Sequence, residues 1–417
     1  MARDDRRRRY RSTELDRALA PARTIVTVGP LDPPSPERIR AVLHAAENHC
    51  VDARLTVVPE SDEKSWRYEA GLADRAVIPM PEVATTNQAD LVTAVRNRPG
   101  TRAPVEVLVC HDHLVMDYSH GVGDGQFGPL ALAVLAADDQ SRVGLLAEGL
   151  SRNAVWTALR RHYTSKPRAL LDFWRLRKQY KKVEEDENAP RRRIENWESA
   201  KSTLGAYLAP EQVARLKSWA KEHRPGATTA SLTVAMWLAA LRAEGVRYDG
   251  HVMILMNCRR YLGEGYASAQ GNFAVGIPIP MPPSESPAEI AALVRTIIES
   301  GWPIMILGMA ELRSLMRSPR TPENPTVVEV PDRVRLSVSD IGRMSFFDGQ
   351  QWAGDRPPQL SAFLEPDGPD AVTLLVSELN GGRTLTASFC SAMIEPATIT
   401  RALDRVCSEP VALLSGP

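Results

Sequence analysis

The chain has 417 residues, 43% of them hydrophobic and 24% charged, a composition typical of a globular protein and sufficient for two domains. Its 51 Lys and Arg residues balance 51 Asp and Glu residues, so the overall charge excludes a strong field toward nucleic acid or an anionic membrane. Five cysteines are scattered and never stand in C-x-x-C spacing, which argues against a disulfide framework or a zinc site and favours a reducing compartment.

The N-terminus carries a basic run, Arg6–Arg9, that no apolar segment follows before Ile25. A secretory signal peptide needs such a segment, and no window reaches the roughly 18 apolar residues of a membrane span. We therefore interpret the run as a solvated terminus, and we expect a cytoplasmic, monomeric protein without a membrane span.

The first half of the sequence mixes helices and strands. Helical spacing of apolar residues follows Pro36, and alternation of apolar residues then indicates two strands joined at a turn, His111-Asp112. An apolar helix comes after three closely spaced glycines. The expected elements are a helix over 36–46, strands over 105–109 and 114–119, and a helix over 130–137.

The second half opens after a stretch, Thr164–Arg193, that is first basic and then acidic, and that we interpret as a solvated helix and linker. Asn380-Gly381-Gly382 is a strong turn signal and predicts a hairpin. The other expected elements are a helix from Pro210, an apolar helix capped by Thr228 or Thr229, strands over 251–258, 273–280 and 333–339, and a closing helix through Ile399 and Val406.

The segment Ser119-His120-Gly121-Val122-Gly123-Asp124-Gly125 carries the residues most suited to chemistry. It places His120 at the end of a strand, on a glycine-rich loop whose backbone turns sharply. Histidine is the side chain best suited to take a proton near neutral pH. Asp124 is close enough in sequence either to orient the imidazole or to brace the loop.

The same loop also matches the G-x-G-x-x-G pattern of dinucleotide-binding proteins over Gly123–Gly128, after a strand and before a helix. No apolar strand follows that helix to carry an acid to the ribose. Asp124 would also face the pyrophosphate, which its charge disfavours. A nucleotide-binding oxidoreductase is therefore the weaker interpretation.

Two further arrangements of the histidines fit poorly. A triad of Ser119, His120 and Asp124 is disfavoured because neighbours on a strand point to opposite faces. A metal site built on His111, His113 and His120 lacks the usual ligand spacing. The remaining alternative for His120 is a structural histidine with satisfied hydrogen bonds.

At these residues the chain resembles the chloramphenicol-acetyltransferase-like acyltransferases, a superfamily that includes the condensation domains of nonribosomal peptide synthetases. Segment 119–125 matches the last six positions of their H-H-x-x-x-D-G motif. Met256–Arg260 is similar to the segment whose arginine pairs with the motif aspartate, and Gly271-Asn272-Phe273 to the G-N-F that follows. Ser337–Gly342 is similar to the late S-N-x-G segment, so the resemblance covers nearly the whole chain.

The resemblance implies an α/β fold of two lobes, each a mixed sheet flanked by helices, in a V shape with a tunnel between them. It implies lobes at residues 1–170 and 201–417 joined by a linker at 171–200.

The resemblance also assigns the site residues. His120 would be the general base, Asp124 would pair with Arg259, Gly125 would complete the motif, and Ser339 would be an oxyanion donor.

It further implies an acyl thioester, on coenzyme A or on a carrier protein acting in trans, as donor, and an amine or alcohol as acceptor. It implies no other cofactor and no metal. We therefore expect a free-standing acyltransferase that forms an amide or ester in natural-product biosynthesis. The alternative is a non-catalytic relative that binds a carrier or ligand in the same tunnel.

Two residues depart from the motif. Ser119 replaces the first histidine, which is the less essential one in the family, so activity is still expected. Gln126 replaces the aromatic residue common after D-G in condensation domains, which weakens an assignment to peptide synthesis.

Overall fold

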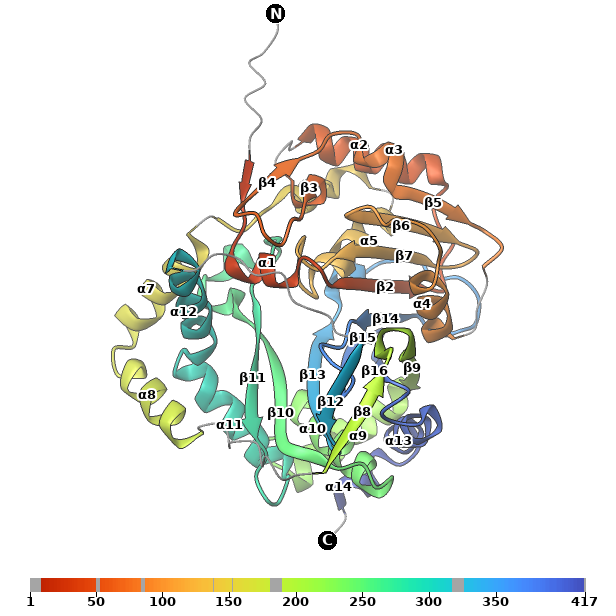
Figure 1. The fold of residues 1–417 in the computed structure, drawn as a ribbon. Helices are drawn as coiled ribbons and strands as arrows, with labels where there is room; N and C mark the ends of the chain where they lie inside the picture. Colours follow the sequence, from red (N-terminus) through yellow and green to blue (C-terminus); the bar gives the residue numbers. More distant parts are fainter. Residues whose placement is uncertain are drawn as a thin grey trace, which may run out of the picture.

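The computed structural model of the chain describes residues 9–49, 53–83, 87–137, 139–151, 153–180, 190–316 and 326–415. Most of the N-terminal basic run, Cys50 and the acidic run Glu184–Glu187 lie outside these ranges. The described residues form two lobes, each built on one large mixed sheet (Figure 1).

The first lobe contains a five-stranded sheet in the order β14-β2-β7-β6-β5. Its strands are β14 (Gln359–Leu364), β2 (Arg23–Gly29), β7 (Leu114–Ser119), β6 (Val105–Cys110) and β5 (Val77–Met80). β6 and β7 are antiparallel and meet at the predicted turn. All residues of both strands are buried, because helices cover both faces.

One face packs against α4 (Gln88–Arg96), and the other against α2 (Pro36–His49) and α5 (Phe127–Ala137). The expected helices over 36–46 and 130–137 are therefore confirmed. The remaining elements of this lobe are short: β1 (Arg9–Arg11), β3 (Val57–Val58), β4 (Ser65–Tyr68), α1 (Glu14–Leu19), α3 (Leu72–Ala76) and α6 (Gly144–Ala147).

The second lobe contains a six-stranded sheet in the order β11-β10-β13-β15-β16-β9. Its strands are β11 (Ala274–Pro280), β10 (Tyr248–Asn257), β13 (Val334–Arg343), β15 (Ala371–Leu379), β16 (Gly382–Cys390) and β9 (Lys201–Leu208). The predicted hairpin is confirmed: Asn380 and Gly381 both have positive φ, at 46° and 84°, as a two-residue hairpin turn requires.

Helices cover this sheet, and one of them is the apolar helix that the sequence predicted after Thr228 or Thr229. Thr228 caps α10 by accepting a hydrogen bond from the Ser231 amide at 3.1 Å, and the helix beyond it is almost wholly buried. The helices of this lobe are α9 (Pro210–His223), α10 (Thr229–Ala243), α11 (Pro287–Glu299), α12 (Trp302–Met316), α13 (Pro396–Ser408) and α14 (Pro410–Ser415).

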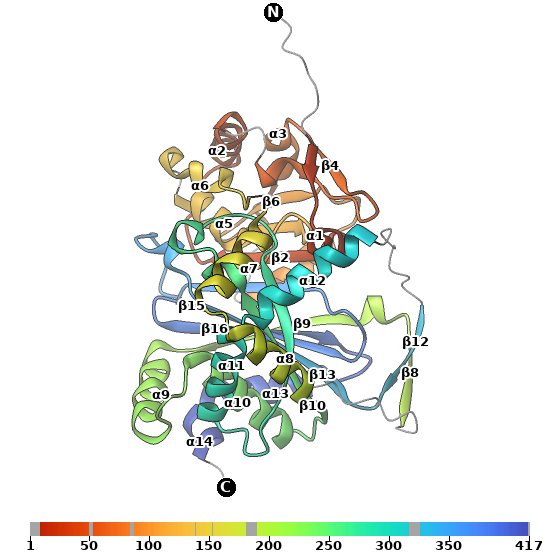
Figure 2. The ribbon, with the colours of Figure 1, turned by 90° about the vertical axis from the view of Figure 1, so that its left-hand side faces the viewer.

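The segment between the lobes is more structured than a bare linker. Helices α7 (Ala154–Ser165) and α8 (Ala169–Gln179) pack beside α11 and α12 on one side of the molecule (Figure 2). Further on, β8 (Arg191–Glu195) forms a two-stranded ribbon with β12 (Val327–Pro331). The predicted boundaries at 170 and 200 fall inside α8 and at the end of a 3₁₀ helix, Trp197–Ala200.

The two lobes share a strand. β14 comes from the second half of the sequence, yet it pairs with β2 at the edge of the first sheet; in Figure 1 the two lie side by side, blue against red. The Ser377 hydroxyl of β15 donates to the Leu360 carbonyl of β14 at 2.7 Å. Leu375 and Leu379 also join the apolar core of the first lobe.

The topology of the first sheet differs from that of a dinucleotide-binding fold. β7 is antiparallel to both of its neighbours, β2 and β6, whereas the dinucleotide fold places its glycine loop between parallel strands. The G-x-G-x-x-G match at Gly123–Gly128 is therefore a coincidence of sequence.

Candidate active site

His120 lies where β7 ends and the glycine loop begins. Its backbone amide donates to the Ala22 carbonyl at 2.8 Å. The Ser119 hydroxyl donates to the Ala20 carbonyl at 2.8 Å, so it is committed to the backbone and does not reach the imidazole. The structure thus agrees with the sequence argument against a triad of Ser119, His120 and Asp124.

The two ring nitrogens of His120 have different surroundings. Nδ1 is buried and has no hydrogen-bond partner among the described residues. The residue as a whole is only partly buried, which leaves Nε2 as the nitrogen that can meet a substrate. An imidazole with one accessible nitrogen is suited to take a proton from a group that approaches that nitrogen.

Asp124 braces the loop. Its carboxylate accepts two hydrogen bonds from the guanidinium of Arg259, at 2.7 and 3.2 Å, and one from the Phe273 amide at 3.0 Å. The exposed fractions of Asp124 and Arg259 are 4% and 3%, so this is a buried bidentate pair that joins the lobes. The resemblance predicted this contact, and it does not involve the imidazole.

The remaining donors of Arg259 are also satisfied. Its Nε donates to the Ala269 carbonyl at 2.8 Å, and Nη2 donates to the Gly271 carbonyl at 2.9 Å. A buried guanidinium whose N–H donors are all hydrogen-bonded is held in one orientation. Arg259 therefore holds segment 269–273 of the second lobe against the loop of the first.

Asn272 from the same segment holds the backbone of His120 itself. Its Nδ2 donates to the carbonyls of His120 and Gly121, at 2.9 and 3.1 Å, and to Asp16 Oδ1 at 2.9 Å. The G-N-F segment thus contacts the loop with all three of its residues: Gly271 and Phe273 through the Asp124–Arg259 pair, and Asn272 directly.

A second buried ion pair, which sequence reasoning missed, lies on the other side of the loop. Arg54 donates to the Val122 carbonyl at 2.7 Å and to the Gly121 carbonyl at 2.9 Å, and it pairs with Asp16 at 2.8 Å. Tyr10 donates to the same carboxylate at 2.6 Å. These residues are distant in sequence from the loop and match no motif, so no sequence signal could have found them.

In this second pair, the surroundings of Asp16 stabilise the ionised form of its carboxylate. Burial on its own would raise the pKa of Asp16, but the Arg54 charge and the hydrogen bonds from Tyr10 and Arg54 outweigh it and hold that pKa below the ordinary value. Asp16 is therefore charged at neutral pH although its exposed fraction is 0%.

Gln126, which replaces the family's aromatic residue, also connects the lobes. Its Oε1 accepts from Asn257 Nδ2 at 3.2 Å, and its Nε2 donates to the Ala267 carbonyl. Gln126 therefore forms a polar link between the loop and the second lobe.

The other two predicted site residues are Gly125, in the loop, and Ser339, on β13. A Cβ built on Gly125 would meet the side chain of Ile341 at 3.7 Å, so the C-terminal part of β13 reaches the loop. Ser339 is on the same strand, with 7% of its surface exposed. The structure brings β13 to the loop, and the role of Ser339 as an oxyanion donor stays a prediction.

Three of the cysteines have thiols that burial makes less acidic. Burial raises the pKa of the thiols of Cys110, Cys258 and Cys407 to about 12. A thiol with so high a pKa supplies little thiolate at neutral pH. Within the described ranges, no group of three His, Cys, Asp or Glu residues is placed to hold a metal ion.

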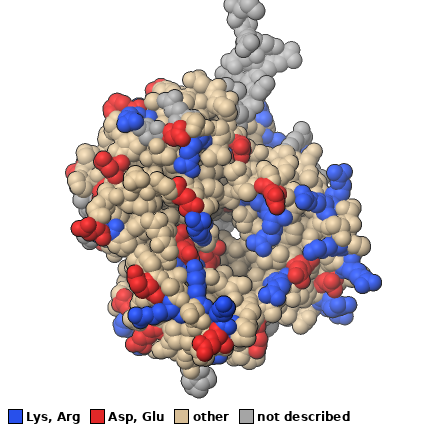
Figure 3. Space-filling view, turned by 180° about the vertical axis from the view of Figure 1, so that it is seen from behind, with Lys and Arg blue, Asp and Glu red and all other residues tan. Residues whose placement is uncertain are grey.

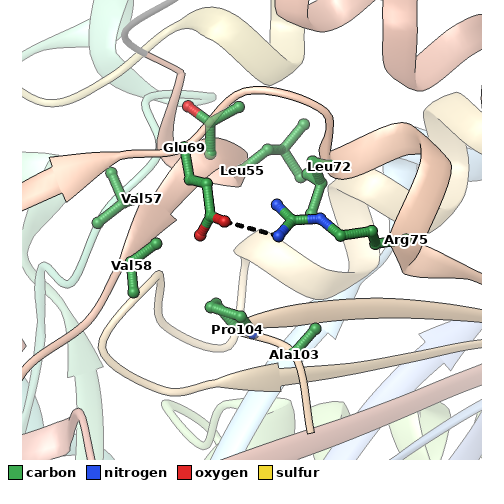
Figure 4. Close-up of a pocket in the computed structure, with 9 residues that line it drawn as sticks. Leu55, Val57, Val58, Glu69, Leu72, Arg75, Ala103 and Pro104 are labelled. Carbon is green, nitrogen blue, oxygen red and sulfur yellow. Dashed lines mark hydrogen bonds and ion pairs between the residues drawn. The ribbon is translucent and has the colours of Figure 1, made fainter.

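A small cavity of about 140 Å³ lies elsewhere in the first lobe (Figure 4). It is lined mainly by apolar side chains, with the ion pair of Glu69 and Arg75 at 2.6 Å among them. It shares no residue with the loop. Seen from behind, the surface of the molecule is hollowed near its centre (Figure 3).

Neither a family model nor a curated protein sequence matches the chain. Solved structures do match it.

The nonribosomal peptide synthetase FmoA3 is 14% identical with a TM-score of 0.60, and the match covers 99% of this chain but only 43% of that protein. The trichothecene 15-O-acetyltransferase TRI3 from Fusarium sporotrichioides is 13% identical with a TM-score of 0.59, covering 98% of this chain and 95% of that one.

The first condensation domain of the CDA synthetase is 15% identical with a TM-score of 0.57, covering 98% of this chain and 97% of that domain. Identities of this size carry information about the fold, and over nearly its whole length the chain has the two-lobed fold of the chloramphenicol-acetyltransferase-like superfamily.

Proposed function

We propose that the protein is an acyltransferase that moves an acyl group from a phosphopantetheine thioester, on coenzyme A or a carrier protein, to an amine or hydroxyl. The observation that carries the proposal is the fixing of the His120 loop: the Asp124–Arg259 pair and Asn272 hold its backbone from the second lobe, while the His120 side chain stays partly exposed with Nδ1 buried. A purely binding protein has no need of a histidine on a loop that is fixed in this way.

The chemistry follows from this geometry. Nε2 of His120 takes the proton of the acceptor N–H or O–H as that atom attacks the thioester carbonyl carbon. A C–N or C–O bond forms, the carbonyl oxygen becomes an oxyanion, and Ser339 is our candidate donor to it. When the C–S bond breaks, the thiolate takes the proton from the imidazolium, and the histidine returns to its neutral form.

Two observations support direct transfer without an acyl-enzyme. The Ser119 hydroxyl is bonded to the backbone, and the cysteine thiols whose pKa burial raises supply little thiolate. The fold also serves an O-acetyltransferase and condensation domains among the solved structures. We infer that donor and acceptor meet at His120 at the same time.

The test combines a substrate screen with intact-mass measurement. The protein is incubated with acyl-coenzyme A and acyl-carrier donors, with and without a pool of amines and alcohols. Product is expected only when both substrates are present, and donor alone should leave the mass of the protein unchanged. A stable adduct on a serine or cysteine, chased into product by acceptor, would contradict direct transfer.

The histidine is tested by substitution. His120→Ala should keep the fold and lose about 10²- to 10⁴-fold in rate, the usual contribution of a positioned base. His111→Ala is the matched control, because His111 is an exposed histidine at the β6–β7 turn and should leave the rate unchanged. Near-native turnover by His120→Ala would remove His120 as the base.

A further inference from the structure

The largest exposed apolar side chains gather on one side of the molecule. Among the described residues six such side chains are exposed, and one of them, Val327, lies on the β8–β12 ribbon. The other five lie on α7, α8 and α12, which share one side in Figure 2. They are Trp156, Leu170, Leu171, Trp174 and Leu312.

The same side is basic. Residues 154–180 include seven Lys and Arg residues and only one acidic residue, Asp172, although the whole chain is neutral. In Figure 3, Lys and Arg side chains gather on the right, the side on which α7 and α8 lie. The exposed basic residues are Arg160, Arg161, Lys166, Arg168, Arg175, Arg177 and Lys178.

Helix α8 is apolar on two faces. Its inner face is buried through Phe173 and Leu176 in a cluster that contains Trp302. Its outer face exposes Leu171 by 66% and Trp174 by 56%, one turn apart. A surface helix ordinarily needs only the inner apolar face, so the outer one has no partner within the described fold.

We propose that this face of α7 and α8 docks on the surface of an anionic lipid bilayer, with α8 in the plane of the interface. Tryptophan and leucine would enter the region between headgroups and acyl chains, where an aromatic ring with a polar edge is stabilised. The surrounding Lys and Arg residues would lie at the level of the acidic headgroups.

A bilayer fits this face better than an acidic protein surface does. Charge alone would suit either partner, but on the outer face of α8 the exposed Leu171 and Trp174 alternate with the exposed Arg175 and Lys178, whose long side chains can reach headgroups while the apolar side chains enter the interface. The face shares no residue with the His120 site, so the proposal stands or falls independently of acyl transfer.

The experiment is flotation of the full-length protein with vesicles of phosphatidylcholine, with and without phosphatidylglycerol. Binding is expected to the anionic vesicles only, and it should weaken as salt is raised. Absence of binding to anionic vesicles would overturn the proposal, and so would equal binding to both kinds of vesicle.

Variants locate the binding surface. Arg175→Glu with Lys178→Glu, and separately Leu171→Ser with Trp174→Ser, should each lower partitioning roughly tenfold or more. Arg215→Glu with Lys221→Glu is the matched control, because it makes the same charge change on exposed residues of α9, at the other end of the second lobe. Circular dichroism and the melting temperature confirm that each variant is folded.

Three other results would overturn the proposal. The α9 control losing as much binding as the α8 charge variant would mean that only overall charge matters. Binding to an acidic polypeptide that the α8 variants abolish, without vesicle binding, would assign the face to a protein. Vesicle binding only after Glu184, Glu185, Asp186 and Glu187 are changed to Ser would mean that the chain's own acidic run occupies the face.

Discussion

At the scale of single residues, the His120 loop is held by two buried ion pairs of similar design. Asp124–Arg259 clamps it from the second lobe, and Asp16–Arg54 clamps it from within the first. Both guanidinium groups also donate to backbone carbonyls, so each pair fixes main chain as well as balancing charge. Burying an ion pair costs desolvation free energy. In return, these two pairs hold the backbone that carries His120 in a single geometry.

The Asp124–Arg259 pair predicts strong coupling between two substitutions. Asp124→Asn and Arg259→Ala should each destabilise the protein by about 3–5 kcal/mol, because each leaves an uncompensated buried partner. The double variant should cost much less than the sum of the two. A double-mutant cycle on chemical unfolding measures the coupling, and additive effects would mean that the two side chains do not interact in solution.

The Asp16–Arg54 pair predicts a specific dependence of stability on pH. Since the pKa of Asp16 is lowered in the folded state, its contribution is present above the unfolded carboxyl pKa of about 3.9 and is lost as pH falls through the folded value. The difference in unfolding free energy between the native protein and Asp16→Asn should therefore shrink as pH is lowered below about 4. Urea unfolding at a series of pH values checks this, and a constant difference would contradict it.

At the scale of elements, the helix after the loop sits unusually close to the sheet. A Cβ on Gly128, in the first turn of α5, would lie 2.9 Å from Tyr118 Cε1 and 2.9 Å from Val26 Cγ2. The absence of a side chain there lets α5 pack directly on β7 and β2. This close packing sets the direction in which the chain leaves the loop.

Gly128→Ala should therefore destabilise the protein by about 1–3 kcal/mol, the usual cost of overpacking a core. Gly265→Ala is the control, because a Cβ there meets nothing within 4 Å and its backbone is not in the left-handed region. Thermal unfolding of both variants is the measurement. Equal melting temperatures for the two would show that the contact of α5 with the sheet relaxes without cost.

At the scale of the whole molecule, the lobes are not separable by cutting the sequence in two. β14 completes the first sheet from the second half of the chain, and β15 contributes to the core of the first lobe. The site lies where the lobes meet, since its base comes from one and its clamps, Arg259 and Asn272, from the other.

No single helix within the described ranges is long and apolar enough to cross a membrane, and only α11 and α12, bent by 47° at their junction, reach that length together.

Because β14 from the second half of the chain completes the sheet of the first lobe, we expect the two lobes to unfold together. Denaturant unfolding followed by tryptophan fluorescence and by far-ultraviolet circular dichroism should give one coincident transition. Two separated transitions would mean that the contacts of β14 contribute little to the stability of the first lobe.

Much of this architecture could be predicted from the sequence, because it depends on local chemistry. The alternation over 114–119, the Asn380-Gly381 turn and the cap at Thr228 each determine an element within a few residues. The motif spacing, read through the family resemblance, also predicted the Asp124–Arg259 contact across 135 positions.

Features that depend on contacts between residues distant in sequence were decided by the tertiary structure alone. Nothing in the sequence of Tyr10, Asp16 or Arg54 marks them as neighbours of the loop, since a buried pair has no periodicity. Pairing of β14 with β2 depends on which sheet edge is open after both lobes have formed. The basic and apolar face of α7 and α8 likewise became visible only when burial separated the two sides of each helix, because a helix with apolar residues all round has no preferred side in sequence.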